Sequence, residues 1–180
     1  MIRVFVGIPA SEEISKKITK WAEDHKDWPL RFVSGTGLHI TVVQPWDAEE
    51  SQITDYEVRC REAVKDIKAF KIRFKEIIFG TSSKRPRLIW TMGVDYDREM
   101  ALKLKSAAET AFGQKPDIRP YNAHLTVARF KEADFEKIPN KDMHEKVDWE
   151  MTVDSIALYE SKLLQSGAEY EILKKIELKR

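Results

Sequence analysis

YNAHLTVAR, from Tyr121 to Arg129, repeats the centre of an earlier segment of the chain. GLHITVV, from Gly37 to Val43, has the same succession of histidine, aliphatic residue, threonine and aliphatic residue. The two histidines are 85 positions apart (124 minus 39). A tetrad that recurs in similar surroundings indicates two related structural segments.

Apolar and polar residues alternate through both segments, which is typical of a half-buried β-strand. Residues two apart on a strand project from the same face. His39 and Thr41 therefore share one face, and so do His124 and Thr126, while their aliphatic neighbours point into a core. The sequence thus predicts two strands that each present an imidazole and a hydroxyl.

The composition is that of an ordinary folded protein. The 180 residues include 42% hydrophobic and 34% charged residues, enough for one domain with a proper core. The formal net charge of +1 argues against binding of long nucleic acid by bulk electrostatics, but leaves room for a local basic pocket that holds one or two phosphates. We therefore expect a single domain over residues 1–180.

The single cysteine, Cys60, excludes an internal disulfide and a cysteine metal cluster. No apolar run approaches the ~20 residues of a membrane span. The apolar residues 2–8 that follow Met1 are too short and too strand-like for a signal peptide. We expect a cytoplasmic monomer without membrane contact.

Helical and strand-like patterns succeed one another along the chain. Strands are expected at 2–8, 31–33, 70–79, 87–94, 153–160 and 168–178, and helices at 11–25, 47–67 and 97–112, with a short helix and surface loop over 131–147. In this reading Gln44-Pro45-Trp46 ends the first His-x-Thr strand. The order predicts an α+β fold of two similar halves, roughly 1–93 and 94–180, with antiparallel strands, helices outside and the two polar strand faces across one central groove.

Two histidines in one groove suit a reaction that removes one proton and delivers another near neutral pH. Phosphodiester cleavage fits, because one imidazole can deprotonate the attacking oxygen and the other can protonate the leaving oxygen. The hydroxyls of Thr41 and Thr126 can donate hydrogen bonds to phosphate oxygens. A zinc site is a competing use of paired histidines, but zinc needs three or four protein ligands and no third one stands at a motif-like spacing. We therefore predict catalytic His39, His124, Thr41 and Thr126, with no metal and no cofactor.

Arg129 lies five residues after His124, an odd offset that places it on the opposite face of a regular strand. It reaches the phosphate only if the strand ends or bulges between the two residues. A guanidinium is the preferred bidentate partner of phosphate, so Arg129 is a candidate substrate-binding residue.

His39-Ile40-Thr41-Val42 and His124-Leu125-Thr126-Val127 resemble the paired motifs of the two-histidine phosphoesterase superfamily. The chain is similar in particular to the RNA 2',3'-cyclic phosphodiesterases, also called 2'-5' RNA ligases or LigT-like proteins, over nearly its whole length. The resemblance implies a bilobal LigT-like fold and metal-independent hydrolysis of an RNA 2',3'-cyclic phosphate end to a 2'-phosphate, with reversible 2'-5' ligation by the same groups. It also implies that His39 is the acid and His124 the base, although the residues alone do not distinguish them.

The chain departs from the family where many members continue with an aromatic residue, leucine and glycine. Here the first motif is followed by Val43-Gln44-Pro45-Trp46. Trp46 and Tyr121 are candidates for stacking on a base, an interaction worth ~1–3 kcal/mol, or equally for packing against the core. Two other functions stay open: a phosphodiesterase for a small cyclic-phosphate nucleotide or ADP-ribose derivative, and a nucleotide- or RNA-binding module without turnover.

Overall fold

The fold is described from a computed structural model over residues 1–81, 84–116, 119–165 and 167–180. The strands in these ranges are β1 (Ile2–Pro9), β2 (Arg31–Phe32), β3 (His39–Ala48), β4 (Phe70–Gly80), β5 (Leu88–Tyr96), β6 (His124–Arg129), β7 (His144–Val153), β8 (Ser155–Leu164) and β9 (Gly167–Glu177). The α-helices are α1 (Glu12–Asp24), α2 (Ile53–Val64) and α3 (Arg98–Ala111).

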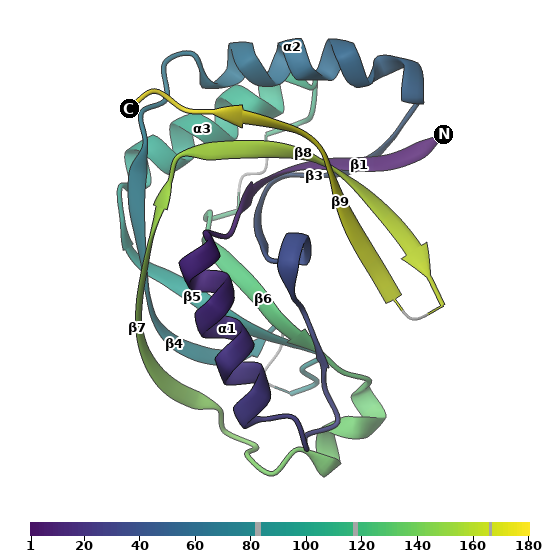
Figure 1. The fold of residues 1–180 in the computed structure, drawn as a ribbon, viewed down its shortest axis with the longest axis vertical. Helices are drawn as coiled ribbons and strands as arrows, with labels where there is room; N and C mark the ends of the chain where they lie inside the picture. The colour runs from purple at the N-terminus through teal and green to yellow at the C-terminus, as the bar shows by residue number, and fades with distance from the viewer. Residues whose placement is uncertain (82–83, 117–118, 166) are drawn as a thin grey trace.

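The strands form two sheets in which the neighbouring strands run antiparallel, with the orders β3-β1-β8-β9 and β2-β6-β5-β4-β7 (Figure 1). The α+β class with antiparallel sheets is therefore confirmed. Both sheets combine strands from before and after residue 93, because β1 pairs with β8 and β4 pairs with β7. A division into two sequence halves stays a prediction, and each lobe of the structure draws on both halves.

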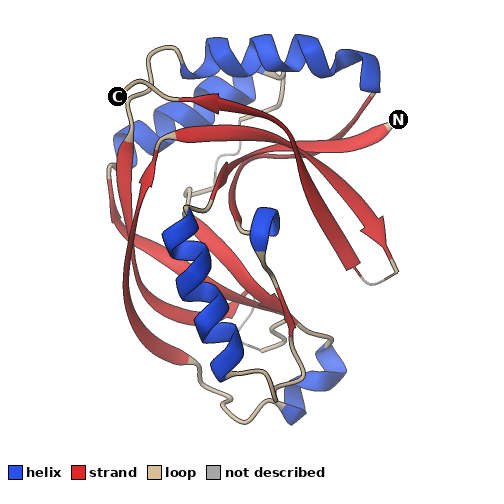
Figure 2. Ribbon diagram, in the orientation of Figure 1, coloured by secondary structure: helices blue, strands red, loops and turns tan. Residues whose placement is uncertain are grey.

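The helices lie outside the sheets. α2 and α3 pack against one another at one end of the molecule, and α1 lies over the second sheet (Figures 1 and 2). Ser11 begins α1 by accepting a hydrogen bond from the Ile14 amide at 3.2 Å, and Ile14, Ile18 and Trp21 form the buried stripe. None of the helices in the part of the chain that the structure describes is long and apolar enough to cross a membrane.

α1 is joined to β7 by a polar cluster. Trp21 Nε1 donates to Glu145 Oε2 at 2.7 Å, and His25 Nε2 lies 2.8 Å from Glu145 Oε1. His25 Nδ1 lies 2.7 Å from the carbonyl oxygen of Trp21, which only accepts hydrogen bonds. His25 therefore anchors the end of the helix to the sheet.

Two predicted segments differ in the structure. β3 continues through Pro45 and Trp46 to Ala48, and α2 begins only at Ile53, after a 3-10 turn at Glu50–Gln52. Pro45 is tolerated because β3 is an edge strand and because Pro45 lies in an irregularity of its register, between the pairs Val4–Trp46 and Val6–Val43. The segment from His144 to Val153 forms β7, although a loop was expected up to residue 147 and a strand only from residue 153, because pairing with β4 makes a strand of a segment rich in charged residues.

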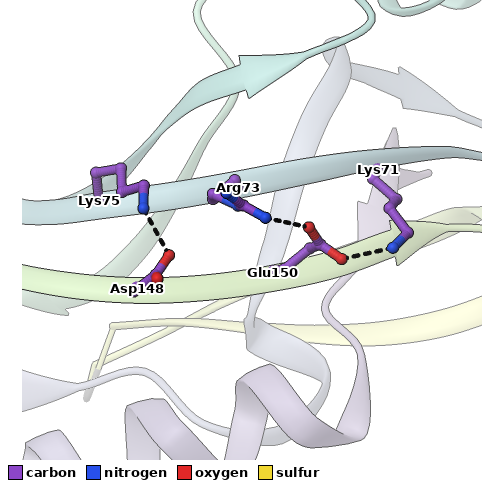
Figure 3. Close-up of polar contacts among 5 residues, drawn as sticks. All are labelled: Lys71, Arg73, Lys75, Asp148 and Glu150. Carbon is purple, nitrogen blue, oxygen red and sulfur yellow. Dashed lines mark hydrogen bonds and ion pairs between the residues drawn. The ribbon is translucent and has the colours of Figure 1, made fainter.

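Charged side chains line the outer face of the β4–β7 pair (Figure 3). Glu150 accepts from Lys71 Nζ at 2.7 Å and from Arg73 Nη2 at 3.0 Å, and Lys75 Nζ donates to Asp148 at 2.7 Å. β7 is the last strand of its sheet. Charges on such an edge disfavour pairing with another chain more than they stabilise this one, because exposed ion pairs contribute little.

Candidate active site

β3 and β6 meet where the two sheets adjoin. β3 is an edge strand. β6 pairs with β5 along one side, and along its other side it pairs with the two-residue strand β2, at the end remote from His124. A hydrogen bond joins the segments, because the Tyr121 hydroxyl donates to the Thr41 carbonyl oxygen at 3.2 Å. We call this seam, which carries His39, Thr41, His124 and Thr126, the groove.

Both histidines are held in the same way. His39 Nδ1 lies 2.9 Å from the carbonyl oxygen of Gly37, and His124 Nδ1 lies 2.9 Å from the carbonyl oxygen of Asn122, each two residues upstream. A carbonyl only accepts hydrogen bonds, so the hydrogen of each neutral ring is on Nδ1. Nε2 of each ring then keeps a lone pair that can accept a proton, and both strands present the same tautomer.

Aromatic side chains surround His39. Its ring centre lies 4.6 Å from that of Phe5, 5.2 Å from Tyr159 and 4.9 Å from Tyr170. Burial lowers the pKa of His39 to about 4, although the hydrogen bond to Gly37 acts in the opposite direction. The positive charges of Arg129 and of protonated His124 lower this pKa further.

His124 stacks at a tilt on Trp90, with ring centres 4.1 Å apart. Burial lowers the pKa of His124, and its hydrogen bond to Asn122 raises it. Each imidazole therefore favours the neutral form in the free protein. The two predicted histidines lie on β3 and β6, the strands that meet at this seam.

A bulge follows the threonine in each strand. In β6, Ile89 pairs with Ala128 and Trp90 with Thr126, so Val127 is an extra residue opposite β5. Val127 and Ala128 are consequently both buried, and Arg129 returns to the face of His124. The bulge that Arg129 needed in order to reach the groove is present.

The same irregularity occurs in β3. Val6 pairs with Val43 and Gly7 with Thr41, so that Val42 is the extra residue. Val42 and Val43 are both buried, and Gln44 is the next exposed residue. Gln44 therefore occupies in β3 the position that Arg129 occupies in β6, five residues after the histidine. The sequence analysis did not identify this role, and the equal offset in the two motifs was the only signal for it.

Arg129 is partly tied to the wall of the groove. Its Nη2 donates to the Tyr170 hydroxyl at 3.3 Å, while its Nε is buried without a hydrogen-bond partner among the described residues. A cavity of about 390 Å³ opens here, and Arg31, Ser34 and Tyr170 also line it. A guanidinium with an unmatched buried N–H is suited to an incoming phosphate oxygen.

Trp46 and Tyr121 have structural contacts that the sequence left open. Trp46 packs on Tyr56 and Phe112, with ring centres 5.7 and 4.9 Å apart. It follows His39 by seven residues on the same extended strand, which separates the two residues by roughly 20 Å. The structure does not bring it to the histidines. Tyr121 lies in the groove wall, where burial raises the pKa of its hydroxyl.

No three His, Cys, Asp or Glu side chains among the described residues are grouped so that they could hold a metal ion. The polar groups that β3 and β6 carry at this seam are two imidazoles, the guanidinium of Arg129 and two threonine hydroxyls. Such a set can exchange protons with a bound anion and stabilise its charge.

Comparison with known proteins places this arrangement in a family. A family model described as the 2'-5' RNA ligase superfamily matches residues 5–163. The chain belongs to this superfamily. The resemblance seen in the two His-x-Thr motifs is thus confirmed.

Curated relatives within the superfamily match almost the entire chain. It is 30% identical over 177 residues to an RNA 2',3'-cyclic phosphodiesterase of Methanocaldococcus jannaschii, covering 96% of this chain and 99% of the relative. It is 27% identical over 175 residues to an RNA 2',3'-cyclic phosphodiesterase of Bacillus subtilis, covering 94% and 93% of the two chains.

Solved structures share the fold. Escherichia coli LigT in complex with 3'-AMP superposes with a TM-score of 0.71 at 20% identity, over 99% of each chain. A Thermus thermophilus protein superposes with a TM-score of 0.76 at 20% identity, over 98% of each chain. The LigT-like bilobal fold implied by the motifs is confirmed.

Proposed function

We propose that this protein is an RNA 2',3'-cyclic phosphodiesterase that opens the cyclic phosphate to a 2'-phosphate by acid–base catalysis between His39 and His124, without a metal. The observation that carries the proposal is that two imidazoles of the same tautomer stand on β3 and β6, the strands that meet where the two sheets adjoin. The names of relatives that match the chain over almost its full length support the substrate.

In the proposed reaction, Nε2 of His124 takes a proton from water, whose oxygen forms a bond to phosphorus. The bond from phosphorus to the 3' oxygen breaks, and Nε2 of His39 gives its proton to that oxygen. Water is consumed and a 2'-phosphate results. With a 5'-hydroxyl in place of water as the nucleophile, the same groups form a bond from that oxygen to phosphorus and release the 3' oxygen, which joins two ends by a 2'-5' linkage.

Charge decides when His39 carries its proton. The low pKa of His39 keeps its ring neutral in the free protein near pH 7. A phosphate anion bound in the groove favours the imidazolium, because an opposite charge close by stabilises the charged form. The acid is therefore charged in the presence of substrate, while Arg129, Thr41 and Thr126 hold the phosphate oxygens.

Hydrolysis assays test the proposal and separate it from the two alternatives. The purified protein, kept in chelator, is given a short RNA with a 2',3'-cyclic phosphate end, a nucleoside 2',3'-cyclic phosphate and an ADP-ribose cyclic phosphate. We expect turnover of the RNA end and a 2'-phosphate product. Binding of all three without turnover would instead indicate a binding module, and turnover of the ADP-ribose compound alone would indicate the second enzyme.

Substitution of either histidine provides the direct test. We expect His39→Ala and His124→Ala to lower kcat by at least about 10³-fold while the fold is retained, because each removes a proton-transfer group. His144→Ala is the matched control, since His144 lies exposed at the start of β7 beside Glu76. Wild-type rates in either groove variant would refute the assignment.

The cellular setting belongs to the same proposal. We propose that the protein acts as a cytoplasmic monomer on RNA ends. Light scattering of the purified protein and fractionation of cells test the two parts separately. A stable dimer, or recovery outside the cytoplasm, would contradict them.

A further inference from the structure

A second cavity adjoins the groove on the side of His124. It has a volume of about 470 Å³. Its wall includes Thr41, Gln44, Lys105, Arg119, Tyr121 and His124. Thr41 and His124 belong also to the groove, so a ligand whose phosphate lies between the histidines can extend into this cavity without leaving the first site.

Gln44 enters this cavity because of the bulge in β3. The extra residue Val42 turns Gln44 to the exposed face, as the bulge in β6 turns Arg129. The two equivalent positions therefore face two different cavities, and Arg129 lines the one near His39. An amide at position 44 can donate as well as accept hydrogen bonds, which an apolar residue there could not do.

Lys105 places a positive charge in the same wall although it is only 8% exposed. Its ammonium group pairs with Glu109 one turn along α3 and lies 6.0 Å from the ring centre of Tyr121. A buried ammonium is unfavourable unless it is paired. Its position is fixed by these contacts, so the charge is held ready at the cavity.

The charges of the cavity favour an anion. Of the described residues that line it, Lys105 and Arg119 are cationic, and none is Asp or Glu. Glu109 pairs with Lys105 but does not itself line the cavity, so the charged groups of the lining are those of Lys105 and Arg119. The amide of Gln44 and the ring of Tyr121 supply polar and aromatic surface beside the cations.

We propose that this cavity is a second phosphate subsite, which binds the phosphate on the 5' oxygen of the ribose that carries the cyclic phosphate, with Lys105 and Gln44 as its specificity-determining residues. This inference rests on the proposed function and deepens it. It predicts that a cyclic phosphate alone is a poor substrate and that the next phosphate along the molecule increases the rate. That phosphate can belong to an RNA strand or to the pyrophosphate of an ADP-ribose derivative.

A minimal pair of substrates tests the subsite. Adenosine 2',3'-cyclic phosphate is compared with the same compound carrying a 5'-phosphate, and kcat/KM is measured for each. We expect the 5'-phosphate to raise kcat/KM by about tenfold or more, the effect of one charge-assisted hydrogen bond. A ratio near one in the wild-type protein would overturn the inference. Absence of turnover of both compounds would count against the proposed function instead, and their relative binding affinities would then test the subsite.

Three variants locate the effect. Lys105→Gln combined with Glu109→Gln removes the cation without leaving a buried carboxylate, and Gln44→Leu removes the amide at an exposed position. We expect the ratio of the two kcat/KM values to fall to about one in the double variant and to fall in part in Gln44→Leu. Lys103→Gln removes the same charge from α3 outside the cavity, where Lys103 Nζ contacts the Asp66 carbonyl oxygen, and should keep the wild-type ratio.

The ratio of the two kcat/KM values distinguishes a role of Lys105 in binding the 5'-phosphate from a role in the stability of the fold. A purely structural role of Lys105 would lower both kcat/KM values together and leave their ratio unchanged, which would overturn the assignment. If the double variant does not fold, Gln44→Leu decides, and a wild-type ratio in that variant would likewise refute the subsite. A dinucleotide with a cyclic end and an ADP-ribose cyclic phosphate then show which source of the 5'-phosphate the wild-type protein prefers.

Discussion

The free energy of unfolding is expected to fall as the pH is lowered, because His39 resists protonation in the folded protein. Substitution of His39 by a residue that does not titrate should remove this part of the pH dependence. The pKa of His39 is lowered from 6.5 to about 4, mainly by burial. The unfolded chain therefore takes up a proton near pH 6.5, whereas the folded protein does so only near pH 4. Acidification between these values favours the unfolded state, since that state binds more protons.

The size of the effect follows from the two pKa values. The difference between 6.5 and about 4, at about 1.4 kcal/mol per pH unit, gives a loss of about 3 kcal/mol in the free energy of unfolding between pH 7 and pH 4. This is a large fraction of the stability of a typical domain. The free energy of unfolding keeps this contribution above about pH 6.5 and loses it most steeply between about pH 6 and pH 4.5.

His39→Asn is the matched variant, because the asparagine amide can still donate to the Gly37 carbonyl oxygen but does not titrate. Urea unfolding of both proteins is followed by tryptophan fluorescence at several values from pH 7 to pH 4. We expect the wild type to lose about 3 kcal/mol more than the variant, since other titrations cancel in the difference. Parallel pH dependence, or a relative gain of stability by the wild type on acidification, would refute the reasoning.

Two further predictions concern the groove and its support. Arg129→Gln should lower kcat/KM by about 10- to 100-fold, because the charged contact to phosphate is lost. The same substitution should raise the pKa of His39, because it removes a positive charge that lowers this pKa. A histidine NMR titration that shows no rise in the pKa of His39 would contradict this. Glu145→Ala should lower the free energy of unfolding by about 2 to 3 kcal/mol, because Trp21 Nε1 loses its acceptor and His25 Nε2 loses its hydrogen-bond partner. Glu145→Gln retains an acceptor oxygen and should recover much of that loss in the same denaturant assay, and an equal loss in both variants would argue against the hydrogen-bond account.

The local pattern of the sequence was sufficient for much of the fold. Alternation around His39 and His124 predicted β3 and β6, and the apolar stripes predicted α1 and α3. These features are readable because each depends on residues close together in the chain. β7 was missed because its charged residues lie on an exposed edge strand, whose pairing with β4 no local pattern reveals.

The placement of Arg129 and Gln44 shows where local pattern ends. The odd offset from each histidine predicts the wrong face for a regular strand, and only a bulge corrects it. A bulge is a mismatch between two strands, so its position depends on the partner strand as much as on the strand itself. Likewise the sequence does not distinguish Lys105 from the other polar residues of α3, and only the tertiary structure shows that it lies beside Tyr121.

By itself the sequence determined that two strands would each offer a histidine and a threonine, because alternation on a strand is a property of neighbouring residues. Tertiary structure alone decided that these strands meet and that burial makes His39 a weak base. The meeting of the strands and the desolvation of His39 depend on residues far apart in the chain, and for that reason they appear only when the two sheets are brought together.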